Sequence, residues 1–315
     1  MWWLLSHLCT CLGRDKAANL LPEEESGGGV DYGYAVAKNE RARMEDAIDI
    51  REDVAGFRLF AVYDGHAGSA AVMLAKENLP RILGRYLQDA ADVEGAIKAA
   101  FQAADEEVMQ ALLENKATAD MADLQTSSGT VACLGLLKNK EMWIANLGDC
   151  RAVVSNDGTA AAISCDHAPE KNAAEAERLK NAGVSVEAGY VDEHVAVSRA
   201  LGNVRLHSGI KVNGITNEPE VFRVAIDDAV DFIMIGSDGI WDALKEQFAL
   251  THARKALRTT AKTEDAAVSI LQNAGRVSKA DNAAVVVIVF KFPEPLPKRP
   301  AVQRKSLTAL QESAA

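Results

Sequence analysis

Residues 57–68 read FRLFAVYDGHAG, a run of mainly apolar side chains that ends abruptly at Asp64 and Gly65. An apolar run of this length, bounded by a turn signal, is typical of a buried β-strand. A Gly after the Asp lets the backbone turn sharply and lets its carbonyl face a ligand. The same arrangement recurs at residues 232–239 (FIMIGSDG), where the run ends at Asp238. The sequence therefore predicts two buried strands that each present a carboxylate at one end.

Further strands are expected on both sides of these two. They are predicted at residues 130–136, 141–147, 151–155 and 284–290. The first two of these are separated by a short polar stretch that suits a hairpin. Adjacent strands joined by tight turns favour antiparallel sheets with helices packed outside them.

Helices are expected where apolar residues recur every three or four positions. Residues 97–112 carry one such face. Residues 170–182 indicate a second helix, which Gly183 stops. Thr263 is expected to cap a third helix that has an apolar side over residues 267–274. With the strands, these helices predict an α+β protein.

The composition is that of an ordinary globular protein. The 315 residues are 48% hydrophobic and 25% charged, which suffices for a full core. With 34 basic and 45 acidic residues the net charge is −11, so we expect no nucleic-acid partner, and the acidic surplus suits metal cations. Five cysteines do not make a disulfide framework, which indicates a reducing, intracellular and cytoplasmic setting.

We expect one compact domain, residues 30–292, with an extension at each end. Residues 1–29 join an apolar start, MWWLLSHLCTCLG, to the hinge PEEESGGG, and residues 293–315 form a Pro-rich basic tail. The start lacks the basic region and cleavage site of a signal peptide. Cys9 and Cys11 lie beside its Trp and Leu residues, which motivates a palmitoylated anchor at a membrane surface. The alternative is an N-terminus that packs on the body or stays loose.

Three acidic residues, Asp64, Asp238 and Asp281, share one context, because each lies next to the end or start of a predicted strand. Carboxylates brought together repel one another and their pKa values rise, and a divalent cation removes that cost. Oxygen ligands without a His or Cys cluster select Mg²⁺ or Mn²⁺ over Zn²⁺. Taken alone, an Asp-Gly pair is more often a simple turn, since such turns are frequent.

The segment RARMEDA and the residue after Gly65 add groups suited to phosphate chemistry. In a strand, Glu45 and Asp46 would point to opposite faces, while Arg41 would share a face with Glu45. A guanidinium beside a metal carboxylate can clamp phosphate oxygens through two hydrogen bonds. His66 is a candidate general acid. The alternatives are a solvated charge run for the segment and a purely structural histidine.

Taken together, nine segments strongly resemble the protein phosphatase 2C family of metal-dependent serine/threonine phosphatases. In family order they are RARMEDA (41–47), FAVYDGHAG (60–68), SGTVA (128–132), ANLGDCRAV (145–153), DHAPE (166–170), AVSRALGN (196–203), EPEV (218–221), GSDGIWD (236–242) and SKADN (278–282). Each segment is short, but nine in order form a highly specific match. The resemblance implies a four-layer α/β/β/α sandwich of two antiparallel sheets, with a binuclear metal site at one end and a flap over residues 166–217.

The resemblance also implies which residues bind metal. Two Mn²⁺ or Mg²⁺ ions would be held by Glu45, Asp64, the Gly65 carbonyl, Asp238 and Asp281. Asp64 matches the bridging ligand, and Glu45 acts mostly through water. Asp149 matches the position that, with Asp238, holds a weaker third metal in some family members.

Other site residues follow from the same match. Arg41 corresponds to the phosphate-binding arginine, and His66 corresponds to the proposed general acid for the leaving alkoxide. Asp46, Thr130 and Asn282 correspond to supporting residues near the metals.

The activity that the resemblance implies is hydrolysis of phosphoserine and phosphothreonine in proteins. A hydroxide that bridges the two metals would attack phosphorus in line, without a phosphoenzyme. Two metals can share a water and clamp such a displacement, and the loose transition state chiefly needs charge neutralisation. No cysteine has an arginine six positions later, so the Cys-x5-Arg signature is absent from the sequence. A monomer is the family-based default.

Three departures from the family pattern fall in or beside the expected flap. Asn203 stands where the family usually has Asp, Ala168 replaces the Lys of DHKP, and residues 190–194 replace an Arg-Val-Asn-Gly segment. They remove no expected metal ligand. They do support an alternative function, a catalytically weak pseudophosphatase or scaffold of the same fold.

Overall fold

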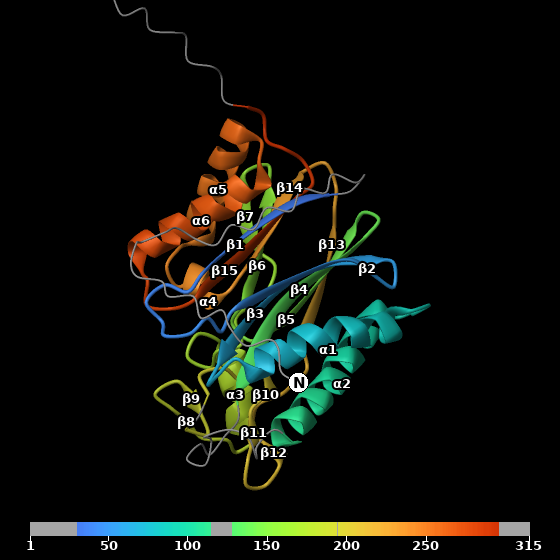
Figure 1. Ribbon diagram of the computed structural model, residues 1–315, viewed down its shortest axis with the longest axis vertical. Helices are drawn as coiled ribbons and strands as arrows, with labels where there is room; N and C mark the ends of the chain where they lie inside the picture. The colour runs from blue at the N-terminus through green and yellow to red at the C-terminus, as the bar shows by residue number, and fades with distance from the viewer. Residues whose placement is uncertain (1–29, 115–127, 194, 296–315) are drawn as a thin grey trace, which may run out of the picture.

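The computed structural model describes residues 30–114, 128–193 and 195–295, which form two antiparallel sheets between layers of helices (Figure 1). The first sheet has the spatial order β1 (Asp31–Ala37), β15 (Ala283–Val289), β14 (Val230–Gly236), β6 (Arg151–Asn156) and β7 (Thr159–Ala162). The second has the order β13 (Glu220–Ala225), β5 (Glu141–Leu147), β4 (Gly129–Lys138), β3 (Phe57–His66) and β2 (Ala47–Val54), and β10 (Leu201–Gly202) pairs with β4.

Helices cover the outer face of each sheet. The second sheet carries α1 (Ala70–Leu87) and α2 (Val93–Glu114), and the first carries α4 (Asp238–Trp241), α5 (Glu246–Thr260) and α6 (Thr263–Val277). The expected flap contains α3 (Ala173–Asn181), the hairpin of β8 (Val186–Glu187) with β9 (Tyr190–Val191), and the pair β11 (Val204–Arg205) and β12 (Ile210–Lys211). The four-layer α+β sandwich is therefore confirmed. Within the ranges described above, no helix is both long and apolar enough to cross a bilayer.

The residues of β3 show why its sequence is apolar without interruption. Leu59, Ala61 and Tyr63 pack against the helices, whereas Phe60 and Val62 pack between the two sheets. Because successive side chains of a strand point to opposite faces, a strand buried on both faces needs apolar residues at both. All seven residues of β14 and of β15 are buried for the same reason.

The predicted strands and helices agree with the structure apart from their ends. Each of the six predicted strands is present. The strand predicted at residues 141–147 has the bounds of β5, and the other five are longer or shifted by up to three residues. The helix expected over residues 97–112 is the larger part of α2. The helix expected over residues 170–182 begins only at Ala173, because the Asn172 side chain accepts hydrogen bonds from the backbone N–H of Ala174 and Glu175 (3.0 and 3.3 Å).

One local prediction is wrong. Thr263 does not cap α6: Lys262 precedes the helix, and the Thr263 hydroxyl donates to the Tyr32 carbonyl of β1 (2.7 Å), which fixes the helix to the sheet. Residues 41–46 lie outside the strands, because β2 begins only at Ala47, so the strand geometry considered for Glu45 and Asp46 does not apply. The backbone of this segment bonds to the Asn282 side chain, which precedes β15 of the other sheet, and makes one bond to Gly65 of β3.

Candidate active site

Five aspartates gather at one end of the sandwich, where strands of both sheets begin or end. They are Asp46, Asp64, Asp149, Asp238 and Asp281. Asp46 lies just before β2 and Asp64 lies near the end of β3, and these ends coincide because the strands are antiparallel. Asp281 precedes β15, Asp238 follows β14 and Asp149 precedes β6, and the register of these neighbouring strands brings their ends together as well. This aspartate cluster combines carboxylates from both sheets.

The electrostatics of the aspartate cluster favour protons or cations. Burial, followed by the charges of Asp46 and Asp238, raises the pKa of Asp64 well above its ordinary value. Burial raises the pKa of Asp46 to about 7, with a further contribution from Asp238 and Asp281. Burial and the charge of Asp238 raise the pKa of Asp149 to about 7. Burial and the charge of Asp281 raise the pKa of Asp238 too.

Two buried side chains join the sheets beside the cluster. The Ser237 hydroxyl, which follows β14, donates to the Asp46 carboxylate of the other sheet (2.7 Å). The Asn282 side chain accepts from the Glu45 backbone N–H (2.7 Å) and donates to the carbonyls of Lys38 and Arg43 (2.8 and 3.1 Å). Asn282 therefore helps to hold the loop that carries Arg41 and Glu45.

Glu45 and Thr130 fix the end of β3. The Gly65 N–H donates to the Glu45 carbonyl (3.1 Å), and a Cβ added at Gly65 would lie 2.7 Å from that oxygen and 2.6 Å from Val72 Cγ2. No side chain fits there, so the glycine is required by the close approach of the two segments. The buried Thr130 hydroxyl lies 3.0 Å from the Asp64 carbonyl and donates to it.

Arg41 reaches the edge of the aspartate cluster. Its Nη2 lies 2.6 Å from Asp281 Oδ2, and its Nε donates to the Ala280 carbonyl (2.9 Å). The two charged side chains are 52% and 38% exposed, so their ion pair contributes only about 0–1 kcal/mol. A guanidinium held this weakly can exchange its partner for the oxygens of a phosphate.

His66 contacts one of the residues that departs from the family pattern. Its Nε2 lies 3.1 Å from Oδ1 and 2.9 Å from Nδ2 of Asn203. Burial lowers the pKa of His66, the hydrogen bond with Asn203 opposes this, and the charge of Lys211 lowers the pKa further. The ring is therefore predominantly neutral at pH 7. Of the other two departures, Ala168 is buried, and residues 190–191 form β9.

The donor set of the cluster suits a hard divalent cation. Among the described residues, no three His, Cys, Asp or Glu side chains already surround one point as a finished ligand set. Nevertheless, the cluster offers oxygen donors, and its carboxylates repel one another. Among the described basic residues, Arg41 alone forms an ion pair with an aspartate of the cluster, Asp281. Oxygen donors of this kind prefer Mg²⁺ or Mn²⁺. A cation would replace the protons that the raised pKa values retain.

Three contacts at the site were not predicted from the sequence. One is the hydroxyl of Ser237 on Asp46, although Ser237 lies inside the GSDG segment. Another is the contact of Asn203 with His66, which the departure from the family pattern could have suggested. The third is Lys171, which pairs with Asp242 and whose charge partly offsets the rise in pKa at Asp149 and Asp238. No sequence signal marks Lys171, because its position near the cluster depends on how the flap folds.

The cysteines divide into two groups. Cys133 and Cys150 are free and buried, and Cys165 is free and exposed. Cys9 and Cys11, the candidate acylation sites, lie outside the described residues.

Comparison with known proteins gives a consistent result. The family model described as Protein phosphatase 2C matches residues 31–283. The rice (Oryza sativa subsp. japonica) protein named "Probable protein phosphatase 2C 54" is 30% identical over 94% of this chain and 82% of its own length. A second rice protein, "Probable protein phosphatase 2C 59", is 33% identical over 89% of this chain and 84% of its own length.

Solved structures agree at the level of the fold. A serine-threonine phosphatase 2C from Toxoplasma gondii superposes with a TM-score of 0.69 at 19% identity, over 87% of this chain and 98% of that one. A C. elegans sex determining protein superposes with a TM-score of 0.70 at 23% identity, over 86% of this chain and 67% of that one. From its sequence and from its fold, the chain belongs to the protein phosphatase 2C family.

Proposed function

We propose that this protein is a phosphatase that hydrolyses phosphoserine and phosphothreonine esters in proteins with the help of Mg²⁺ or Mn²⁺. The observation that carries the proposal is the aspartate cluster, in which the pKa values of Asp46, Asp64, Asp149 and Asp238 are raised, together with an arginine at its edge and a neutral histidine. Membership of the protein phosphatase 2C family supports the same activity. Phosphoryl transfer requires charge neutralisation and positioning more than covalent chemistry, which suits these residues.

Oxygen atoms of the cluster would hold two cations. The candidate ligands are Glu45, Asp64, the Gly65 carbonyl, Asp238 and Asp281, and Asp149 would contribute to a weaker third site. When bound, such cations activate a water as nucleophile and neutralise phosphate charge. Thr130 and Asn282 would support these ligands through their hydrogen bonds with the Asp64 carbonyl and the Glu45 N–H. Asp46 would support the site through its hydrogen bond with Ser237.

Arg41 and His66 would act on the substrate itself. Arg41 would release Asp281 and bind two phosphate oxygens with its guanidinium, which orients phosphorus for in-line attack. His66 in its protonated form would give a proton to the leaving serine or threonine oxygen. Because the pKa of His66 is lowered, its imidazolium is a stronger acid than an ordinary one, although less of it is present at pH 7.

The first test is turnover by the purified protein. We expect hydrolysis of p-nitrophenyl phosphate and of a phosphothreonine peptide with Mn²⁺ or Mg²⁺, and none with EDTA. Asp238→Asn and Asp64→Asn should abolish turnover because they remove carboxylates from the cluster. Retained turnover in either variant would refute the site assignment.

A second candidate function is a weak pseudophosphatase or scaffold of the same fold. The observation that favours it is Asn203, which faces His66 where the family usually has a carboxylate. A folded protein that binds Mn²⁺ in a calorimetric titration but shows no turnover with either ester would support this candidate. In that case Asn203→Asp is the first change to test for recovery of activity.

For the N-terminus we propose a peripheral membrane contact through acylated Cys9 and Cys11, on an otherwise monomeric, cytoplasmic protein. The proposal rests on the Trp and Leu residues around the two cysteines. One acyl chain binds a bilayer only marginally, so both cysteines should matter. The double change Cys9→Ser and Cys11→Ser should move the protein from the membrane fraction to the supernatant, and unchanged partitioning would contradict the anchor.

A further inference from the structure

His167 is a buried histidine that the proposed mechanism does not use. Its backbone N–H donates to the Gly148 carbonyl (2.9 Å), and its ring Nδ1 accepts from the Gly148 N–H (3.0 Å). Both polar groups of Gly148 are thus bound by one residue. Gly148 immediately precedes Asp149 of the aspartate cluster, so the direction in which the chain leaves Gly148 decides where Asp149 points.

Gly148 occupies a position that few residues could take. Its φ is +104°, and a Cβ added there would lie 2.2 Å from Val131 Cγ1. A glycine in this region has wide conformational freedom, so its conformation must be fixed by its neighbours. The two hydrogen bonds with His167 supply that constraint. The Asn146 side chain adds a third, because its Nδ2 donates to the same Gly148 carbonyl (3.1 Å).

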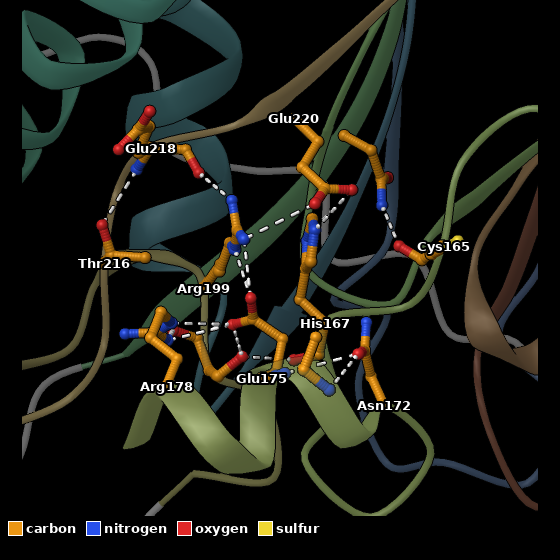
Figure 2. Close-up of polar contacts among 12 residues, drawn as sticks. Cys165, His167, Asn172, Glu175, Arg178, Arg199, Thr216, Glu218 and Glu220 are labelled. Atoms are coloured by element: carbon orange, nitrogen blue, oxygen red, sulfur yellow. Dashed lines mark hydrogen bonds and ion pairs between the residues drawn. The ribbon is translucent and has the colours of Figure 1, made fainter. Parts of the chain in front are cut away.

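The other ring nitrogen of His167 faces a carboxylate. Its Nε2 lies 3.3 Å from Glu220 Oε2, and Figure 2 shows the ring directed at the Glu220 side chain. Because Nδ1 accepts a hydrogen bond, the neutral ring carries its proton on Nε2. This buried group makes no hydrogen bond with the described residues, and its 3.3 Å contact with Glu220 is electrostatic. Burial and the charge of Arg199 lower the pKa of His167, which keeps the ring in the neutral form that can accept from Gly148.

A network of the flap holds the backbone of His167. The Ser198 N–H donates to the His167 carbonyl (2.8 Å), and the Ser198 hydroxyl, which lies 2.9 Å from that carbonyl, donates its proton to Glu175 of α3. Arg178 and Arg199 donate to the Glu175 carboxylate (Figure 2). Although burial opposes it, the hydrogen bonds from Arg199, Ser198 and Arg178 lower the pKa of Glu175 to about 2, so this anchor stays ionised.

We propose that His167, oriented by Glu220, is a positioning residue that holds Gly148 in its left-handed conformation and thereby directs Asp149 into the aspartate cluster. This proposal deepens the proposed function and rests on it, since it gives Asp149 a part in binding a cation. It also connects the flap, through Glu175 and Ser198, to one carboxylate of the cluster.

The direct test is made by NMR on the full-length, metal-free protein. The ¹⁵N shifts of the His167 ring should show Nδ1 without a proton and Nε2 with one, and a protonated Nδ1 would overturn the proposal. His167→Leu should raise the exchange rate of the Gly148 amide roughly tenfold, equivalent to about 1.4 kcal/mol. His167→Asn should stay within about threefold of the wild type, because its Oδ1 can take the place of Nδ1 as acceptor.

Two further variants keep this test decisive. His252→Leu on α5 changes a histidine away from the cluster and must leave the Gly148 exchange rate unchanged. If His167→Leu does not fold, Glu220→Ala replaces it, because the Glu220 side chain is 40% exposed and its loss leaves the core intact. We expect Glu220→Ala to raise the Gly148 exchange rate about threefold, and an unchanged rate would overturn the orienting role.

Calorimetric titration with Mn²⁺ alone tests whether His167 affects cation binding through Asp149. His167→Leu should weaken the Mn²⁺ site that Asp149→Asn weakens, and the double variant should bind no worse than Asp149→Asn alone. Fully additive losses would overturn the link between the two residues. The NMR readouts need neither metal nor turnover, so they decide the role of His167 even if the protein proves to have no phosphatase activity.

Discussion

If His66 is the proton donor, its loss should slow hydrolysis of esters with poor leaving groups more than hydrolysis of esters with good ones. His66→Ala should slow hydrolysis of a phosphothreonine peptide by about 10²–10⁴-fold, the usual contribution of general acid catalysis. Hydrolysis of p-nitrophenyl phosphate should fall by less than about tenfold, because nitrophenolate leaves without a proton. The exposed His207 supplies the control, since His207→Ala should change neither rate. Equal slowing of both esters by His66→Ala would rule out the proton-donor role.

Substitution of Gly65 tests how closely the segments around the aspartate cluster pack. Gly65→Ala should destabilise the protein by about 1–3 kcal/mol, because the new methyl group would meet Val72 and the Glu45 carbonyl at 2.6 and 2.7 Å. Gly275→Ala is the matched control. It lies within α6 with no atom within 4 Å of the added methyl, so it should stabilise by about 0.5–1 kcal/mol. Urea unfolding of both variants measures the difference, and a destabilisation of the same size in both would contradict this account.

At the scale of elements, the sequence predicted the strands better than the helices and loops. Strands buried on both faces are marked by apolar runs that need no partner to be recognised, as in β3 and β15. By contrast, α1 and α5 were not predicted, and α1 contains Pro80, which interrupts the usual signal of a helix. The conformation of the loop over residues 41–46 could not be predicted from local sequence, because it involves a contact with Asn282, 237 residues beyond Glu45.

The Asn282 side chain makes three hydrogen bonds to the backbone of residues 38–45, and a substitution can remove all three. Asn282→Ala should destabilise the protein by about 1–3 kcal/mol, because the Glu45 N–H and the carbonyls of Lys38 and Arg43 would lose their partner. It should also raise KM for the phosphopeptide, since Arg41 lies on this loop. Asn273→Ala on α6, which also removes a half-buried amide, should leave KM unchanged. An unaltered KM in Asn282→Ala would show that the loop holds Arg41 without the amide.

At the scale of the whole molecule, the candidate site could be identified residue by residue but not assembled from the sequence. Segments of the family pattern pointed to Asp64, Asp238 and Asp281. Their proximity follows from antiparallel register between strands far apart in the chain, which local patterns do not encode. The hydroxyl of Ser237 on Asp46 joins the two sheets, and such a contact exists only once both sheets have packed.

The aspartate cluster makes the stability of the whole molecule depend on pH and on metal. Without metal, the raised pKa values of Asp46 and Asp149, about 7 in the folded protein against 3.8 for an ordinary Asp, mean that the folded state binds more protons. The contribution of these groups to stability is therefore fully present below about pH 4 and is lost as pH rises through 7. For Asp46 alone the loss is on the order of 4 kcal/mol.

A bound cation should cancel this loss, because it favours the ionised carboxylates. The difference in Tm between samples with Mn²⁺ and with EDTA should accordingly widen between pH 5 and pH 8, and groups far from the cluster cancel in that difference. Asp238→Asn removes one of the repelling charges, so it should raise Tm in EDTA at pH 8 while it abolishes turnover. Parallel Tm curves with and without Mn²⁺, or a lower Tm for Asp238→Asn in EDTA, would mean that repulsion among these carboxylates does not limit the stability of the metal-free protein.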